Sequence, residues 1–298
     1  MNHIKEAVNA RQVYQLGYTG KNIRIAILDT GISPHPDLIH RQIIFCDFVH
    51  NREEMYDDNG HGTHVAGIIC GDGSASNRRL QGMAPRADLV VLKVLDHKGN
   101  GETEAVIAAI EWLKQNYKRY QIKLLNFSVG FLPNSDVGEQ RRLLDAIEEL
   151  WDMGMMVVAA AGNNGPRPTS ITVPGISRKI LTIGASDDSG KGMINNQIQN
   201  NYSGKGPTNC CIVKPEILAP GTRILSCDNR TNGYVYKSGT SMSAPIACGA
   251  LALGMEKYPG VSPEEWKLRL YESAWPRGEM IHKKCWGILN VDNLIQMN

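Results

Sequence analysis

Residues 23–31 read Ile-Arg-Ile-Ala-Ile-Leu-Asp-Thr-Gly, an apolar run that ends on a carboxylate and a turn-permitting glycine. Apolar runs of this length, bounded by turn residues, are typical of strands buried on both faces. Such strands are expected at Ile23 to Leu28, Ile43 to Phe48, Leu89 to Leu95, Leu124 to Val129, Met155 to Ala161 and Ile180 to Ala185. Between them, helical apolar spacing occurs at Thr103 to Tyr117 and Arg141 to Met153. The alternation predicts an α/β fold, a mostly parallel central sheet with helices on both faces.

The composition is that of a globular protein. The 298 residues are 42% apolar and 21% charged, which excludes a disordered, collagenous or coiled-coil chain. Lys and Arg total 32, Asp and Glu total 30, and no block of like charges offers a phosphate-binding stripe, so no nucleic-acid partner is expected. No apolar run reaches the roughly 18 residues that a membrane helix needs. No linker rich in Pro, Gly or Ser divides the chain, so we expect a single domain over residues 1–298.

The first residues and the cysteines favour the cytoplasm. The N-terminus lacks the apolar segment of roughly 7–15 residues that a secretory signal requires. The chain has 7 cysteines, an odd number without a Cys-x-x-Cys pair, so we interpret them as reduced thiols in a cytoplasmic protein. The adjacent Cys210 and Cys211 offer a redox-sensing or metal-binding alternative, but isolated thiols are more often packing residues.

Active groups in parallel sheets collect where strands end, and four positions of this kind stand out. Asp29 ends the first expected strand, where a carboxylate is usually a turn or cap residue. His61 is framed by glycines at the start of a small-residue helix, either as a satisfied histidine or as an imidazole open to a carboxylate and a nucleophile. Asn163 follows a buried run, either as a left-handed turn residue or as an amide donor for an oxyanion. Ser241 precedes an apolar helix, either as its cap or as a residue whose N–H faces an anion.

Asp, His and Ser follow one another here in one of the known chain orders of a Ser-His-Asp triad. The sequence resembles the subtilases, the subtilisin-like serine proteases, through Asp29-Thr30-Gly31, His61-Gly62-Thr63-His64-Val65-Ala66-Gly67 and Gly239-Thr240-Ser241-Met242-Ser243-Ala244-Pro245. The match runs from about Thr19 to about Ser273 and leaves residues 274–298 as a C-terminal extension. Within the family it looks closest to the intracellular, AprX-type members, through Tyr56-Asp57-Asp58-Asn59-Gly60-His61, Gly73-Ser74-Ala75-Ser76 and Lys214-Pro215-Glu216-Ile217-Leu218-Ala219-Pro220-Gly221.

The resemblance implies a serine endopeptidase with the subtilisin-like three-layer fold. Ser241 Oγ would attack the peptide carbonyl, His61 would act as general base and then acid, and Asp29 would orient the imidazole. Asn163 and the Ser241 backbone N–H would hold the oxyanion. Met242 is either a core methionine or a site where oxidation crowds the catalytic centre.

The resemblance also implies how a protein or peptide substrate binds. Two extended segments would pair with it, Gly99-Asn100-Gly101 and Ser128-Val129-Gly130, and main-chain pairing favours broad specificity. The primary pocket would lie at Ala160, Gly162 and Thr172, and it contains no acid. We therefore expect an uncharged, mostly apolar or aromatic residue before the scissile bond (P1).

Three further residues bear on this cleft. Phe131 stands where many relatives have glycine and would narrow the cleft. Asp57 and Asp58 either favour a basic residue one position before P1 or are solvated loop carboxylates, the interpretation that we prefer.

Two departures from the family pattern concern folding and metal. Fewer than thirty residues precede Asp29, so no propeptide domain is evident, and folding would proceed unaided or a short N-terminal segment would control activity. Many subtilases bind calcium through a loop after the histidine helix and an aspartate matched here by Asp37. The loop from Gly71 to Gly82 contains two arginines, which conflict with the all-oxygen coordination of calcium. We expect no required cofactor and no metal ligands, with weak calcium binding left open.

Other classes of protein predict different residues. A zinc enzyme using His61 and His64 would carry His-Glu-x-x-His, which is absent. An α/β-hydrolase esterase would carry Gly-x-Ser-x-Gly around Ser241. A catalytically dead binding protein of the same fold would usually lose a triad member. The physiological substrate and the oligomeric state stay open, and the segment from Trp275 to Asn298 is expected to pack on its own chain.

Overall fold

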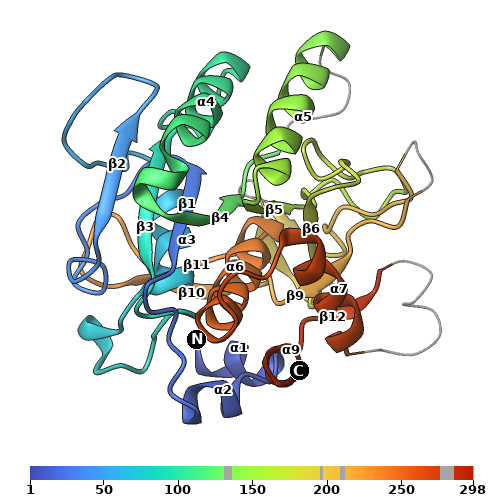
Figure 1. Ribbon diagram of the computed structural model, residues 1–298. Helices are drawn as coiled ribbons and strands as arrows, with labels where there is room; N and C mark the ends of the chain where they lie inside the picture. Colours follow the sequence, from blue (N-terminus) through green and yellow to red (C-terminus); the bar gives the residue numbers. More distant parts are fainter. Residues whose placement is uncertain (131–135, 195–196, 209–211, 276–284, 298) are drawn as a thin grey trace.

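A computed structural model describes residues 1–130, 136–194, 197–208, 212–275 and 285–297 (Figure 1). Within them, the centre is an eight-stranded sheet in the order β12-β9-β6-β5-β4-β1-β3-β2. Every neighbouring pair in it is parallel. Its strands are β1 (Arg24–Asp29), β2 (Ile43–Asp47), β3 (Asp88–Lys93), β4 (Ile122–Phe127), β5 (Met156–Ala160), β6 (Leu181–Ala185), β9 (Ile217–Ala219) and β12 (Gly287–Ile288). The α/β prediction is confirmed, and each predicted strand is present with ends shifted by at most two residues.

The sheet topology places a switch point at β1. The chain runs from β1 to β2 and β3 on one side, and then to β4, β5 and β6 on the other. Because all strands point the same way, their carboxyl ends meet at one edge, and the loops that leave β1 in opposite directions open a crevice there. Asp29, the last residue of β1, lies at that crevice.

Helices form the two outer layers. On one face α3 (His61–Cys70) packs against α6 (Thr240–Lys257), which also contacts β4, β5, β6 and β9. The other layer pairs α4 (Thr103–Tyr120) with α5 (Val137–Asp152), standing side by side in Figure 1. The helix predicted from Arg141 begins four residues earlier, because the carboxylate of Asp136 accepts hydrogen bonds from the N–H groups of Gly138 and Glu139 at the first turn.

Helix α6 is the buried centre of its layer. Nearly every residue from Thr240 to Met255 is buried, which fits its all-apolar and small-residue sequence. A helix held on all sides by core packing fixes the position of its first turn, and Ser241 lies in that turn.

The remaining elements are short. They are α1 (Asn2–Ala7), α2 (Arg11–Gln15), η1 (Ser74–Ser76), the hairpin of β7 (Gly192–Ile194) and β8 (Gln197–Gln199), the hairpin of β10 (Ile224–Cys227) and β11 (Tyr234–Lys237), α7 (Pro263–Ser273) and α9 (Val291–Gln296). Among the described residues, no helix combines the length and the apolar character needed to span a bilayer.

The end of the chain packs on the rest of the molecule. Strand β12 pairs with β9 in the central sheet. The carboxylate of Asp292 in α9 accepts hydrogen bonds from the backbone N–H groups of Gln12 and Val13, at 3.0 and 2.9 Å. The described part of the C-terminal extension thus joins the sheet and binds the N-terminal helices.

Candidate active site

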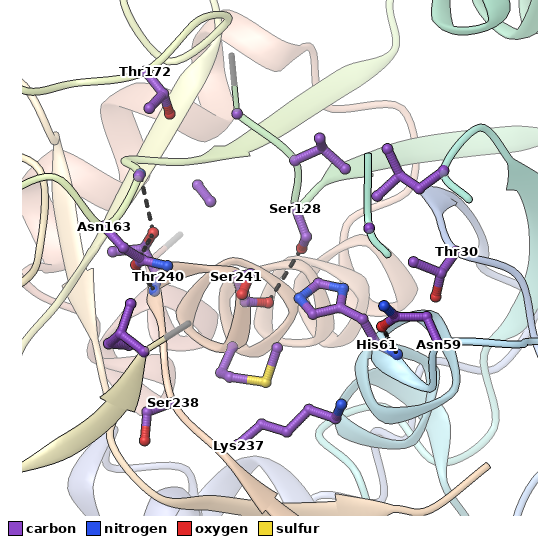
Figure 2. A pocket seen from close by; sticks show the side chains of 18 of the residues that line it. Thr30, Asn59, His61, Ser128, Asn163, Thr172, Lys237, Ser238, Thr240 and Ser241 are labelled. Atoms are coloured by element: carbon purple, nitrogen blue, oxygen red, sulfur yellow. Dashed lines mark hydrogen bonds between the residues drawn. The ribbon is translucent and has the colours of Figure 1, made fainter. Parts of the chain in front are cut away.

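The structure brings Asp29 and His61 into direct contact. His61 Nδ1 lies 2.7 Å from Oδ1 and 2.9 Å from Oδ2 of Asp29, whose side chain is fully buried. The carboxylate therefore holds a proton on Nδ1 and leaves Nε2 as the basic nitrogen. In Figure 2 the imidazole faces Ser241. Among the described residues no hydrogen bond joins His61 to Ser241, and catalytic contacts of this kind often tighten only when substrate binds.

Two glycines make that contact sterically accessible. A Cβ on Gly31 would lie 2.1 Å from the carbonyl oxygen of Tyr56, and a Cβ on Gly62 would lie 2.1 Å from the carbonyl oxygen of Gly31. Glycine at these two positions lets the turn after β1 approach both the Tyr56 backbone and the first turn of α3. Of the two glycines framing the histidine, Gly62 therefore serves this backbone approach, which brings the start of α3 to the end of β1.

Asp57 is a buried structural hub, which corrects its interpretation as a solvated loop carboxylate. Its Oδ1 accepts hydrogen bonds from Thr30 Oγ1 and Gly60 N, and its Oδ2 accepts from Thr63 N and Thr63 Oγ1. Burial alone would raise the pKa of Asp57, but the hydrogen bonds from Thr63, Gly60 and Thr30 outweigh it and lower that pKa. The carboxylate thus fastens the turn after β1 to the start of α3.

The side chain of Asp58 is exposed, but its carboxylate forms an ion pair. Its Oδ1 lies 2.8 Å from Nζ of the fully buried Lys93. That pairing already neutralises the carboxylate that would attract a basic substrate residue.

Pro245 of α6 leaves the backbone carbonyl of Ser241 to a hydrogen-bond donor from outside the helix. Pro245 lies four residues further along α6 and has no N–H to donate to the Ser241 carbonyl. The Ser128 hydroxyl donates to that carbonyl instead, at 3.2 Å, and Asn126 Nδ2 donates to the Ser128 oxygen at 2.7 Å. The serine motif is in this way tied to the end of β4, the segment predicted to bind substrate.

Asn163 points its amide nitrogen at the open space beside Ser241. Its Oδ1 accepts hydrogen bonds from Thr240 N at 2.9 Å and Thr240 Oγ1 at 3.2 Å, so the side-chain orientation is fixed and Nδ2 remains available. Gly239 keeps the space open, because a Cβ there would lie 3.1 Å from Asn163 Nδ2 and 3.2 Å from Ser241 Oγ. An oxyanion forming on a carbon bound to Ser241 Oγ would develop near this amide.

Most of the predicted site residues line one cleft of about 840 Å³ (Figure 2), and Asp29 is buried behind His61. His61, Ser241 and Asn163 line it, together with Gly99, Asn100, Ser128, Val129, Gly130, Ala160, Gly162 and Thr172. Gly101 is not among the lining residues: its α-carbon faces back toward Leu95 and Val94, where a Cβ would meet atoms at 2.5 and 2.8 Å. The role of Gly101 in main-chain pairing with a substrate stays a prediction. Phe131, Cys210 and Cys211 lie outside the described residues.

Thr172 shapes the pocket between two glycines. A Cβ on Gly130 would lie 2.3 Å from Thr172 Oγ1, and a Cβ on Gly162 would lie 2.5 Å from Thr172 Cγ2. Thr172 Oγ1 is buried and has no hydrogen-bond partner among the described residues. Gly130, Gly162 and Thr172 therefore wall the pocket with bare backbone and an uncharged side chain.

The cleft also has a side that sequence reasoning missed. Met193, Tyr236, Lys237 and Ser238 line it from the β7–β8 and β10–β11 hairpins. Short hairpin strands leave no long apolar run, so nothing local in the sequence signalled that they border Ser241.

His64 is a buried packing residue. It is fully buried, and its Nε2 donates to the carbonyls of Ile224 and Val235 at 3.1 and 3.0 Å. Burial lowers the pKa of His64 to about 3, so the ring is neutral. The second histidine of the motif therefore joins α3 to the β10–β11 hairpin.

The calcium expectation can be tested at Asp37. Its Oδ1 accepts from Ala75 N at 2.8 Å and its Oδ2 from Tyr234 Oη at 2.9 Å, so both oxygens already have donors. Among the described residues, one group brings metal-ligand atoms within 4.8 Å of one another: His35, Asp37 and Cys227. His35 Nε2 donates to the Gly233 carbonyl and Nδ1 accepts from Asp37 N, so its ring has no unused lone pair. These residues do not fit a bound dication.

Comparisons with known proteins agree with this geometry. The model of the subtilase family, Peptidase_S8, matches residues 20–293. Serine protease AprX of Bacillus subtilis (strain 168) is 38% identical over 282 residues, 88% of this chain and 64% of AprX. Subtilisin DY of Bacillus licheniformis is 32% identical over 292 residues, 97% of this chain and 96% of that protein. The chain thus spans less than two thirds of AprX and nearly all of Subtilisin DY.

Two solved structures of proteases superpose on this chain. A cold adapted subtilisin-like serine proteinase superposes with a TM-score of 0.74 at 26% identity, covering 92% of this chain and 90% of that one. The prenylagaramide maturation protease PagA superposes with a TM-score of 0.75 at 26% identity, covering 96% of each chain.

Proposed function

The chain belongs to the subtilase family, and from that premise we propose that it is a serine endopeptidase that cleaves protein or peptide substrates after an uncharged residue. The observation that carries the proposal is the arrangement around Ser241. The Asp29–His61 pair faces this hydroxyl from one side, and the oriented amide of Asn163 lies on the other.

The first half of the reaction follows from these positions. Ser241 Oγ attacks the substrate carbonyl carbon while His61 Nε2 takes its proton. Asp29 stabilises the resulting imidazolium through Nδ1. The oxyanion accepts hydrogen bonds from Asn163 Nδ2 and from the Ser241 N–H, which lies in the first turn of α6 and has no acceptor within the helix.

The second half regenerates the enzyme. The imidazolium gives its proton to the leaving amine, the carbon–nitrogen bond breaks, and an ester forms on Ser241. A water molecule then loses a proton to His61 and attacks the ester. When the bond between the acyl carbon and Ser241 Oγ breaks, His61 returns the proton to Ser241 Oγ and the new carboxylic acid departs.

Specificity at P1 is proposed from the pocket around Thr172. A charged P1 side chain would lose its hydration there without gaining a counter-charge, which is costly. An apolar or aromatic side chain would pack against Gly130 and Gly162. Main-chain pairing along Ser128 to Gly130 would tolerate varied residues elsewhere.

We further propose that the chain acts as one catalytic domain in the cytoplasm and needs no metal. The five described cysteines, Cys46, Cys70, Cys227, Cys248 and Cys285, carry free thiols, which suits a reducing compartment. Antibody detection in fractionated cells tests the location, and recovery with secreted protein would contradict it.

Hydrolysis of casein by the parent and by Ser241→Ala tests the proposed function. We expect the variant to lose nearly all activity while keeping the parent's circular dichroism spectrum. Equal activity in the two proteins would overturn the proposal. A peptide series with Leu, Phe, Lys or Glu at P1 then tests the pocket, and cleavage fastest after Lys or Glu would refute the uncharged preference.

A further inference from the structure

The cleft contains a cation without a counter-ion. Lys237 is the last residue of β11, and its half-buried side chain lines the cleft with His61 and Ser241. Among the described residues it makes no hydrogen bond and no ion pair. Burial lowers the pKa of Lys237, and the carboxylates of Asp57, Asp29 and Asp228 oppose that shift.

Within the described part of the chain, none of these three carboxylates forms an ion pair with Lys237, and Asp228 Oδ2 accepts a hydrogen bond from Thr231 Oγ1. Both oxygens of Asp57 are occupied by the turn before α3. Asp29 is occupied by His61 and by the N–H of Thr30. The ammonium group is therefore half-buried in the cleft, and the described residues accept no hydrogen bond from its three donors.

The position of Lys237 in the cleft indicates which half of a bound peptide would lie next to it. Figure 2 shows Ser128 and Thr172 on one side of the Ser241–His61 pair, and Lys237 and Ser238 on the other. The acyl half of a bound peptide runs along Ser128 to Gly130 and fills the pocket at Thr172. A peptide that continues through Ser241 must then pass over Lys237 with its leaving-group half.

We propose that Lys237 selects substrates that carry a carboxylate in the first two residues after the scissile bond, P1′ or P2′. This inference rests on the proposed function, because the reaction defines which half leaves. An Asp or Glu side chain there would supply the counter-charge that the protein does not. Tyr236 and Met193, which are 56% and 58% exposed, line the same cleft and offer it apolar surface.

The test uses internally quenched peptides with one fixed P1 Leu, amidated C-termini, and Glu, Gln or Lys at P1′ or at P2′. Amidation removes the terminal carboxylate, so only the side chain can bind the ammonium group. We expect Glu to exceed Gln in kcat/KM by about three- to tenfold at one of the two positions, as for a partly buried ion pair. That ratio should fall as salt is raised.

Substitutions at Lys237 separate the effect of its charge from the effect of its side-chain shape. Lys237→Met should bring the Glu-to-Gln ratio to about one, Lys237→Arg should keep it, and Lys237→Glu should make the Lys peptide the fastest. The matched control is Lys98→Met, which removes the other cleft lysine, beside Gly99 and Asn100 on the acyl side. Its Glu-to-Gln ratio should equal that of the parent.

Two failures are distinguishable. If no peptide is cleaved, the proposed function fails. If all peptides are cleaved at similar rates by the parent, or if Lys237→Met keeps the preference for Glu, then the protease assignment survives and the role of Lys237 is refuted.

Discussion

Replacing Gly239 by alanine should nearly abolish catalysis while the fold survives. Gly239 has φ +144°, and its added Cβ would lie 3.1 Å from Asn163 Nδ2 and 3.2 Å from Ser241 Oγ. An oxyanion must itself sit about 2.7–3.1 Å from its donor. The methyl group would therefore occupy the space in which the oxyanion forms.

The expected magnitude has two parts. Loss of one oxyanion donor lowers kcat by about 10²–10³-fold. A hundredfold loss corresponds to about 2.7 kcal/mol of transition-state stabilisation. The unusual φ adds a conformational cost of about 1–3 kcal/mol, which should appear in the free energy of unfolding.

A matched control separates these parts. Gly260 has φ +91° and nothing within 4 Å of an added Cβ. Gly260→Ala should lower stability to a similar extent and leave kcat unchanged. We would measure kcat and KM on one chromogenic peptide, and urea unfolding of all three proteins. If Gly239→Ala kept kcat within a few fold of the parent, the assignment of this space to the oxyanion would be refuted.

Three further outcomes are expected. Asn163→Ala should lower kcat by about 10²–10³-fold with little change in KM. Asn163→Asp should lower kcat further, because it keeps the acceptor for Thr240 but turns a carboxylate toward the oxyanion. A wild-type kcat in either variant would contradict the role of Asn163. His64 has a folded pKa of about 3 against 6.5 when exposed, so the unfolded chain binds the extra proton first. The free energy of unfolding should therefore fall from about pH 6.5 toward pH 3, by up to about 1.4 kcal/mol per pH unit, and a urea series on His64→Gln should show a flatter profile unless another group dominates acid unfolding. Removing divalent cations with EDTA should leave Tm unchanged, because the Asp37 oxygens are already bound by Ala75 and Tyr234; a drop of several degrees that calcium reverses would count against this.

Local sequence patterns were sufficient for the core of the fold. Strands β1, β3 and β5 are continuous apolar runs, and burial on both faces of a parallel sheet requires that pattern. Strands β9 and β12 have only three and two residues, and their pairing depends on chain segments about seventy residues apart. Such short, non-local strands leave no periodic signal to read.

The site residues also divide into those that local sequence patterns indicate and those that only the folded structure brings to the site. Asp29, His61, Asn163 and Ser241 were predictable because each stands next to the glycine or strand end that its chemistry requires. The role of Asp57 was misjudged because its sequence neighbours do not show that it is buried. Four of its five donors come from Asn59, Gly60 and Thr63, and only the fifth, Thr30 Oγ1, comes from the turn after β1. That Gly101 lies outside the cleft lining was not predictable, because a sequence motif does not tell which way a loop faces. Lys237 carries no motif, and only its place beside Ser241 gives it a role.

The most direct measurement is the reaction of the purified protein with a fluorophosphonate, followed by peptide mass spectrometry. The account predicts one adduct per chain on Ser241 Oγ, formed far more slowly in His61→Ala and absent in Ser241→Ala. Labelling of a different residue, or equally fast labelling of Ser241 without the imidazole, would contradict it.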